Sequence, residues 1–300
     1  CNTFQRRHSK KKNIGMVGIG MMGHGIASNI LKHGHALTVL EHAGNQPLDA
    51  LKAAGARSVA RAADVAAQSD VVILVLTGSP QVEAVLTGEG GVLAGLRPGT
   101  VVMDCSTALP SSTVRMAQAV AQAGGRFLDT PMTRTPKEAA EGRLNLLVGG
   151  DAALLDECRP ILQCFAENIF HAGPIGAGHS MKLLHNVVSL GTVALIAEAA
   201  ACSAQHGVPP EAFVDILAKG GGGGVALERL RPYLLSGDTS SLRFSLANAC
   251  KDLGYYNTMA GDADSARAIA AAVLGTLEGA RQAAPEALVP ELPALLAKKT

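Results

Sequence analysis

The sequence predicts an α/β protein in which a doubly wound, mostly parallel β-sheet is followed by an all-helical region. Between residues 13 and 174, short apolar runs alternate with Ala-rich amphipathic segments, the pattern of β-α-β units. From residue 175 to residue 300 no strand-like run follows, and helical patterns continue. With 300 residues, 48% of them hydrophobic, the chain has enough apolar surface for one or two cores.

Six strands are expected in the first part of the chain. Each is a nearly continuous apolar run bounded by Gly, Pro, Ser or Asp, as in a sheet whose two faces are both covered by helices. These runs are Ile14–Ile19, Leu37–Glu41, Val71–Leu76, Val101–Asp104, Phe127–Asp129 and Leu144–Val148.

A long helix is expected to join the two parts, from about His179 to Gln205. Gly207 and the two prolines that follow stop it. Its apolar stretch contains Glu198 and follows other ionisable residues, which favours a buried helix over a membrane span. Residues Gly220–Gly224 cannot form a helix interior, because each glycine costs about 1 kcal/mol there relative to alanine. They are expected to form a flexible loop.

Charge and composition argue against nucleic acid as a partner. The chain has 26 basic and 25 acidic residues, and five of the basic ones lie within residues 1–12, so the remainder is net acidic. Residues 1–12 are expected to form a disordered basic tail. Aromatic residues make up only 3% of the chain and tryptophan is absent, which disfavours stacking of bases.

The cysteines indicate a reducing compartment and no metal centre. They form no C-x-x-C motif and no zinc quartet, and the histidines and acids show no spacing typical of metal ligands. No secretory signal is evident, so a cytoplasmic protein is expected. All six are expected to be small core residues: Cys1, Cys105, Cys158, Cys164, Cys202 and Cys250.

A glycine motif, Gly18-Ile19-Gly20-Met21-Met22-Gly23, follows the first expected strand and opens a helix. In such a motif the first glycine makes a tight turn, the second lets the backbone approach a pyrophosphate, and the third lets helix pack on strand. Glu41 ends the second strand, where an acid accepts the ribose hydroxyls and repels a 2′-phosphate. Residues 13–174 are therefore predicted to be a Rossmann-type NAD(P)-binding domain that prefers NAD over NADP.

Three polar segments suggest a catalytic site. Lys182, His185 and Asn186 fall on one face of the long helix, where burial without a function would be unfavourable. Residues 129–135 follow a strand and so lie near the carboxyl edge of the sheet, where ligands bind. The third segment, 244–253, contains a Lys-Asp-Leu triplet.

With the glycine motif, these segments resemble the β-hydroxyacid dehydrogenase family, which includes 3-hydroxyisobutyrate dehydrogenase, tartronate semialdehyde reductase and sulfolactaldehyde reductase. The resemblance covers nearly all of residues 13–300 and implies a helical substrate and oligomerisation domain over 175–300. It implies that Lys182 is the catalytic lysine and Asn186 the catalytic asparagine. A lysine can donate to the carbonyl as hydride arrives, or take the hydroxyl proton in reverse, with a pKa brought toward neutrality by partial burial and by Lys251.

The resemblance also implies the substrate residues. Thr133 takes the place of the serine in the family's D-x-P-V-S-G-G motif, and Arg134 and Thr135 replace its glycines, as in sulfolactaldehyde reductases. Arg134 is expected to bind a carboxylate, sulfonate or phosphate; alternatively it points to solvent or braces Asp129. Lys251 and Asp252 match the family's K-D-L motif.

The Cys-Ser-Thr segment at 105–107 matches the family segment beside the nicotinamide ribose. Further cofactor contacts are therefore expected from Leu76, Ser106, Thr107 and Lys251. The segment Gly176–Asn186 also fits the G-A-G-H-x-x-K-x-x-H-N pattern of decarboxylating 6-phosphogluconate dehydrogenases. Those enzymes carry a glutamate proton donor where this chain has Ser189. His185 is expected to bind substrate, or else to cap a packed helix face.

These features predict an NAD-dependent oxidoreductase that interconverts a small anionic 3-hydroxyacid, or a related hydroxyalkyl acid, with its semialdehyde. The expected assembly is a homodimer or homotetramer without membrane or nucleic-acid partners. An oxidative decarboxylase, a non-catalytic dinucleotide-binding relative and an imine reductase stand as alternatives. The presence of Lys182, Asn186 and Lys251 argues against the second, and imine reductases generally lack the lysine.

Overall fold

The computed structural model describes residues 11–297, which form two compact units. The first runs to Lys182 and the second starts at Leu183, so they divide inside helix α9 (Ala177–Gln205). The sequence-based boundary at 174/175 lies just before this helix. The predicted disordered tail lies outside the described residues except for residues 11 and 12, and so does Cys1.

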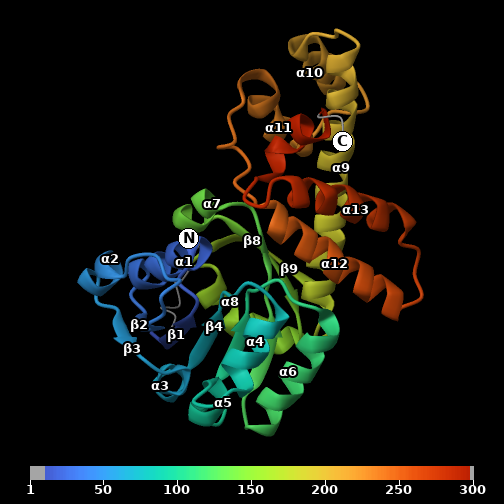
Figure 1. Ribbon diagram of the computed structural model, residues 1–300. Coiled ribbons are helices and arrows are strands. Elements are labelled where there is room, and N and C mark those ends of the chain that lie inside the picture. The colour runs from blue at the N-terminus through green and yellow to red at the C-terminus, as the bar shows by residue number, and fades with distance from the viewer. Residues whose placement is uncertain (1–10, 298–300) are drawn as a thin grey trace, which may run out of the picture. The chain divides into compact units, whose positions relative to one another are not determined.

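The first unit is built on a nine-stranded sheet, in the order β3-β2-β1-β4-β5-β6-β8-β7 with β9 beside β8 (Figure 1). Neighbours from β3 to β6 are parallel, and β8 is antiparallel to β6 and β7. This confirms the doubly wound, mostly parallel sheet. The strands are β1 (Asn13–Val17), β2 (Ala36–Leu40), β3 (Arg57–Val59), β4 (Val71–Leu74), β5 (Val101–Asp104), β6 (Arg126–Asp129), β7 (Met132–Thr133), β8 (Leu144–Gly149) and β9 (Ala166–Gly173).

The six expected strands are all present, and three more were not predicted. Neither β3 (Arg-Ser-Val) nor β7 (Met-Thr) forms an apolar run, and β9 carries polar residues because much of it is exposed. Three predicted strands end one or two residues early: β1 at Val17, β2 at Leu40 and β4 at Leu74. The apolar residues beyond these ends belong to loops at the carboxyl edge of the sheet.

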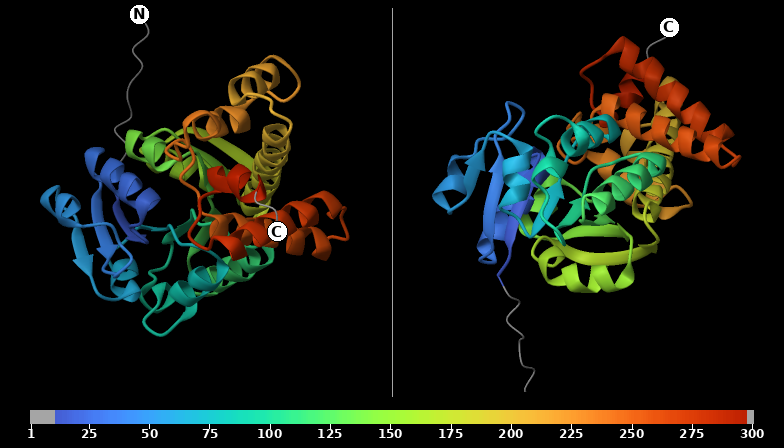
Figure 2. Two further views of the ribbon diagram at one scale, coloured as in Figure 1. Left: turned by 45° about the horizontal axis from the view of Figure 1, so that its top comes forward. Right: turned by 90° about the horizontal axis from the view of Figure 1, so that it is seen from below.

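Helices cover both faces of the sheet (Figures 1 and 2). Successive strand residues point to opposite faces, so Ile73 packs in one core cluster and Val72 and Leu74 in another. One cluster includes side chains of α1, α2 and α8, and the other includes side chains of α3, α4, α5 and α6. The helices are α1 (Met21–Lys32), α2 (Asp49–Ala53), α3 (Ala62–Ala67), α4 (Ser79–Thr87), α5 (Val92–Gly95), α6 (Pro110–Gln122), α7 (Pro136–Glu141) and α8 (Ala152–Leu162).

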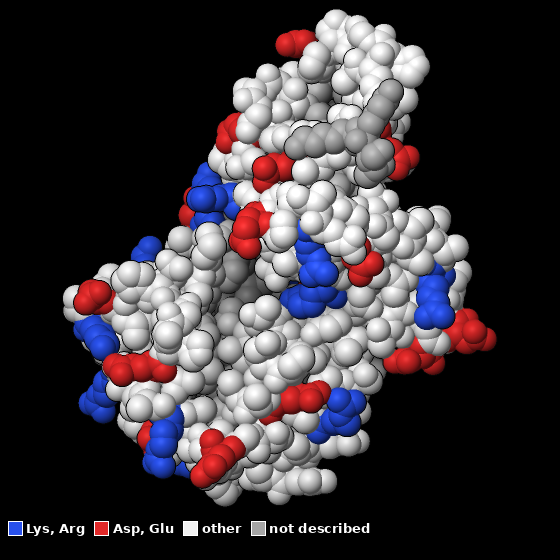
Figure 3. Space-filling model, in the orientation of Figure 1, with Lys and Arg blue, Asp and Glu red and all other residues white. Residues whose placement is uncertain are grey.

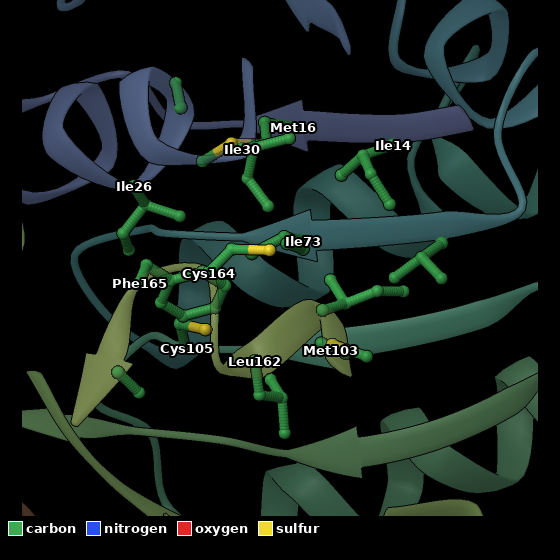
Figure 4. Close-up of a cluster of buried hydrophobic side chains, with 14 of the residues drawn as sticks. Ile14, Met16, Ile26, Ile30, Ile73, Met103, Cys105, Leu162, Cys164 and Phe165 are labelled. Atoms are coloured by element: carbon green, nitrogen blue, oxygen red, sulfur yellow. The ribbon is translucent and has the colours of Figure 1, made fainter. Parts of the chain in front are cut away.

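Four cysteines are core residues as predicted, but the prediction for Cys202 is wrong. Figure 4 shows Cys105 and Cys164 among the isoleucines of the first cluster, and Cys158 and Cys250 are also buried. Cys202 is exposed near the end of α9. Its neighbour Ala201 is buried, and successive helix residues point about 100° apart, so Cys202 is turned away from the core.

The described part of the second unit is helical, as predicted. Residues Gly220–Gly224 form the turn between two of its helices rather than a helix interior. Side chains of α9, including Leu190, Val193 and Ala197, pack in its core. The helix α9 is long and apolar enough to cross a membrane, a property that core helices of soluble proteins share. The further helices are α10 (Pro210–Lys219), α11 (Val225–Ser236), α12 (Leu246–Asp262), α13 (Ala268–Ala283), the 3-10 turn η1 (Val289–Glu291) and α14 (Leu292–Ala297).

Charges of both signs are interspersed on the surface of the first unit. On the face drawn in Figure 3, Lys and Arg side chains of this unit stand beside Asp and Glu. Several charged side chains of the first unit are paired, such as Arg126 with Glu157 and Arg143 with Glu141, each at 2.6 Å. This face therefore presents no extended field of one sign.

Candidate active site

The glycine loop between β1 and α1 has the geometry of a phosphate-binding turn. Gly18 has φ +95°, and a Cβ there would lie 2.1 Å from the Val75 carbonyl oxygen, so only glycine fits. A Cβ on Gly23 would lie 2.1 Å from the Gly18 carbonyl oxygen, which explains how α1 packs so closely. At Gly20, the N-cap of α1, nothing lies within 4 Å of the Cβ position. Open space at a helix N-terminus fits the pyrophosphate of a dinucleotide.

The other residues of the loop differ in what they can offer a cofactor. The side chain of Ile19 is fully buried, and its backbone N–H donates to Asn45 Oδ1 at 3.2 Å. The carbonyl of Ile19 accepts from Gln46 N at 2.7 Å. In the first turn of α1, Met21 is exposed and Met22 half-buried. Asn45 therefore fastens the loop, since its Nδ2 also donates to the Leu40 carbonyl oxygen at 2.9 Å.

Glu41 follows β2 directly, as a ribose-binding acid should. Its Oε1 accepts from Ser58 Oγ at 2.6 Å and from Lys52 Nζ at 3.2 Å. The Ser58 hydroxyl first, and then Lys52, hold the pKa of this exposed carboxyl below its usual value. Glu41 is thus an oriented carboxylate with a basic neighbour, which the sequence did not reveal.

The carboxyl ends of β4 and β5 bring two predicted cofactor residues together. Ser106 Oγ accepts from the backbone N–H of Leu76 at 2.9 Å, and Ser106 N donates to Asp104 Oδ1 at 3.0 Å. Thr107 follows and is half-buried. This is the edge at which open α/β sheets bind ligands.

Asp129, at the end of β6, holds the start of α9. Its carboxylate is fully buried and accepts from the backbone N–H groups of Gly176 and His179, each at 2.9 Å. One turn later, Lys182 Nζ donates to the carbonyl oxygen of Met132 in β7 at 2.7 Å. The catalytic lysine predicted from the sequence therefore lies against the strand that carries Thr133. The buried Thr133 Oγ1 accepts from Asn145 Nδ2 at 3.1 Å.

Arg134 and Thr135 have partners that the sequence did not indicate. Arg134 has φ +80°, a conformation that glycine adopts readily and that costs other residues about 1–2 kcal/mol. Its Nη1 donates to the Glu167 carboxylate and to the Arg143 carbonyl oxygen, rather than pointing to solvent or to Asp129. Thr135 caps α7 in a capping box with Glu138.

In the helical unit, the four remaining predicted site residues form one cluster. Asn186 Nδ2 donates to Asp252 Oδ2 at 2.7 Å, and its Oδ1 lies 2.9 Å from His185 Nδ1. Lys251 Nζ lies 3.2 Å from Asp252 Oδ1. Asn186 and Asp252 are both buried, so the two amide contacts fix the orientation of the asparagine side chain.

Both parts of the chain match family models of nicotinamide-dependent dehydrogenases. Residues 13–173 match the NAD binding domain of 6-phosphogluconate dehydrogenase, and residues 176–288 match the NAD-binding domain of NADP-dependent 3-hydroxyisobutyrate dehydrogenase. The chain belongs to the 3-hydroxyisobutyrate dehydrogenase-like family. This confirms the family resemblance found in the sequence. The second matched domain, residues 176–288, contains all of α9.

Two relatives with assigned names are also dehydrogenases. An NAD-dependent L-serine dehydrogenase from Pseudomonas aeruginosa is 38% identical over 226 residues, 74% of each chain. A 2-(hydroxymethyl)glutarate dehydrogenase from Eubacterium barkeri is 34% identical over 82% of this chain and 81% of its own. The structure of 3-hydroxyisobutyrate dehydrogenase from Mycobacterium tuberculosis with L-serine shares the fold, with TM-score 0.86, 24% identity and coverage of 96% of this chain and 100% of the other.

The chain is thus an NAD(P)-linked oxidoreductase that acts on CH–OH groups, as predicted. Sequence reasoning missed several residues that organise the site. Asp104 and the ring of His179 are buried beside Asp129, and Lys52 and Ser58 contact the carboxylate of Glu41. The sequence offered signals for the buried group: His179 lies within the motif Gly176–Asn186, and Asp104 and Asp129 end the adjacent strands β5 and β6. Among residues 11–297, no group of three or more His, Cys, Asp or Glu side chains could hold a metal ion.

Proposed function

We propose that this chain transfers hydride between NAD and a small anionic 3-hydroxyacid, or a related hydroxyalkyl acid, whose product is the semialdehyde. The observation that carries the proposal is the placement of Lys182 against Met132 in β7, beside the predicted substrate residue Thr133. A panel of hydroxy acids and semialdehydes, including sulfonated and dicarboxylic members, should show reduction of NAD or oxidation of NADH. Absence of turnover with every member would favour the non-catalytic alternative.

A bound nicotinamide cofactor would supply a hydride acceptor in oxidation (NAD) and a hydride donor in reduction (NADH). Lys182 acts as the general acid–base group. Its Nζ accepts the proton of the substrate hydroxyl during oxidation and donates a proton to the carbonyl oxygen during reduction. The Met132 carbonyl orients the amine for this role. Asn186, with its amide held by Asp252 and His185, is proposed to bind the substrate, and Lys251 to contact substrate and cofactor.

Arg134 is proposed to bind the anionic end of the substrate. Both of its observed contacts use Nη1, and a guanidinium has five N–H donors, so the pair with Glu167 does not use up the group. Thr133 and Thr135 flank it. We propose that the positive charge favours a carboxylate or sulfonate end group.

Arg134→Ala should lower kcat/KM for the anionic substrate by about ten- to a hundredfold, the effect of losing a charge-assisted hydrogen bond of roughly 1.5–3 kcal/mol. A neutral substrate analogue should be almost unaffected. Glu167→Gln keeps the arginine and removes the charge of its partner, so it should not lower kcat/KM. Equal losses with both substrates would make Arg134 a structural residue.

Glu41→Ala should reduce the preference for NAD over NADP by about ten- to a hundredfold, because hydrogen bonds to the ribose hydroxyls and repulsion of a 2′-phosphate are both lost. The measurement is kcat/KM with each cofactor. Asp49→Ala, which removes an exposed acid on α2, is the matched control and should leave the ratio unchanged. An unchanged ratio in Glu41→Ala would remove this residue from cofactor selection.

Oxidation is expected to proceed without loss of carbon dioxide. The decarboxylating relatives have a carboxylic proton donor where α9 carries Ser189, and a serine hydroxyl cannot take over that function. Trapping evolved carbon dioxide during NAD reduction tests this directly. Stoichiometric release would support the oxidative decarboxylase.

The enzyme is further proposed to be a cytoplasmic homodimer or homotetramer. Val188 and Leu195 on α9 are large apolar side chains with exposed fractions of 69% and 70%, which a second subunit would cover. Light scattering of the purified chain should give a mass of two or four subunits. A monomer at micromolar concentration would contradict the proposed assembly.

A further inference from the structure

His179, in the first turn of α9, is a buried polar group to which the proposed chemistry gives no role. Its imidazole is fully buried in the first unit. Nε2 lies 3.0 Å from the backbone carbonyl oxygen of Ser106, and Nδ1 lies 2.7 Å from Thr113 Oγ1 in α6. The ring therefore joins α9 to the end of β5 and to α6.

The partners of the ring determine where its proton lies. A carbonyl oxygen only accepts, so the contact with Ser106 requires a proton on Nε2. The Thr113 hydroxyl is also 3.1 Å from the Leu109 carbonyl oxygen, so it can either donate to Nδ1 or accept from it. Both ring nitrogens thus have a partner whichever charge the imidazole carries.

Two buried carboxylates face the ring. Asp104 Oδ2 lies 3.8 Å from Nε2, and Asp129 Oδ2 lies 3.9 Å from Nδ1. Burial raises the pKa of Asp104, and Asp104 Oδ2 has no hydrogen-bond partner within residues 11–297. In so enclosed a cluster, removing one polar member leaves its buried partner without a hydrogen bond, which is costly.

Capping of the helix does not require the ring. Asp129 accepts the backbone N–H groups of Gly176 and His179, so the start of α9 already has its acceptor. The imidazole adds a separate connection, to Ser106. That residue also accepts from the backbone of Leu76 and so belongs to the predicted nicotinamide side of the sheet edge.

We propose that His179 is a positioning residue whose Nε2–H bond to the Ser106 carbonyl fixes the first turn of α9, and with it Lys182, against the strand edge predicted to hold the cofactor. Lys182 follows one turn later and reaches β7. A displacement of about 1 Å between reacting groups can cost a hundredfold in rate, so this connection affects turnover more than binding. The inference rests on the proposed function of Lys182.

Two amide variants that differ by one methylene test the proposal. Glutamine at 179 can place its amide nitrogen near the position of Nε2 and keep the bond to Ser106. Asparagine reaches only to the position of Nδ1, beside Thr113. His179→Asn should lower kcat by about ten- to a hundredfold with KM for NAD within about twofold, whereas His179→Gln should retain kcat within about threefold.

His171→Asn is the control for loss of a histidine–carbonyl contact elsewhere in the first unit, because the ring of His171, an exposed residue of β9, lies 2.8 Å from the Gly150 carbonyl oxygen. It should leave kcat unchanged. Amide hydrogen exchange of residues 174–182 gives a readout independent of activity: it should be about tenfold faster in His179→Asn and unchanged in His179→Gln.

Equal kcat or equal exchange in the two amide variants would overturn the positioning role. A chain with Lys182→Met that keeps full turnover would instead overturn the proposed function. In that case the exchange measurement still reports whether His179 fastens the first turn of α9.

Discussion

Replacing Lys182 by alanine is expected to lower turnover by about two to four orders of magnitude and to leave NAD binding unchanged. This is the usual contribution of a positioned acid–base group. The structure adds a reason for the specific effect on turnover: Nζ contacts β7 through the Met132 carbonyl and lies on a different segment from the glycine loop. Steady-state kcat and a separate titration of NADH binding measure the two effects.

Two further variants separate chemistry from packing. Lys182→Met keeps the length of the side chain without its amine and should lose as much turnover as alanine. Lys137→Ala removes an exposed lysine from α7 in the same unit and should have no effect. Near-normal turnover in both Lys182 variants would exclude this residue from proton transfer.

Asp129→Ala is expected to lower the free energy of unfolding by about 3–5 kcal/mol. Two backbone N–H groups at the start of α9 would lose a charged acceptor in a fully buried environment, and each such loss costs about 1–3 kcal/mol. Removing the carboxylate also takes a negative charge from a helix N-terminus. Urea unfolding followed by circular dichroism measures the change.

Asp151→Ala supplies the comparison. Asp151 is the exposed N-cap of α8 and accepts one N–H, from Leu154 at 2.8 Å, so its loss should cost only about 1 kcal/mol. Asp129→Asn keeps one acceptor oxygen and should lie between the two. If Asp129→Ala and Asp151→Ala destabilise equally, the buried carboxylate is not what holds α9.

The parts of the fold that the sequence predicted are those specified by local patterns. Nearly continuous apolar runs identified six strands, whereas β3 (Arg-Ser-Val) and β7 (Met-Thr) contain no such run. The strand β9 was not predicted because it lies at the edge of the sheet, where many of its side chains are exposed and polar. Cys202 was misplaced because composition alone does not indicate which face of a helix is buried.

The candidate site also combines features that a local pattern predicts with contacts that it does not. The turn at Gly18 and the acid after β2 could be predicted, since each depends on a few consecutive residues and the strand before them. The side chains that contact Arg134 and Glu41 could not be predicted from the sequence. Arg134 meets Glu167, 33 residues away, and Glu41 meets Ser58, 17 residues away.

The sequence by itself determined the dinucleotide turn, six of the nine strands, and the one helical face that carries Lys182 and Asn186. Tertiary structure alone decided what those residues contact. Asp129 and His179 are 50 residues apart, and Ser106 and His179 are 73 apart. Contacts at such separations depend on how strands align in the sheet and where α9 packs on them. Those positions are set by burial summed over the whole unit, which no local pattern records.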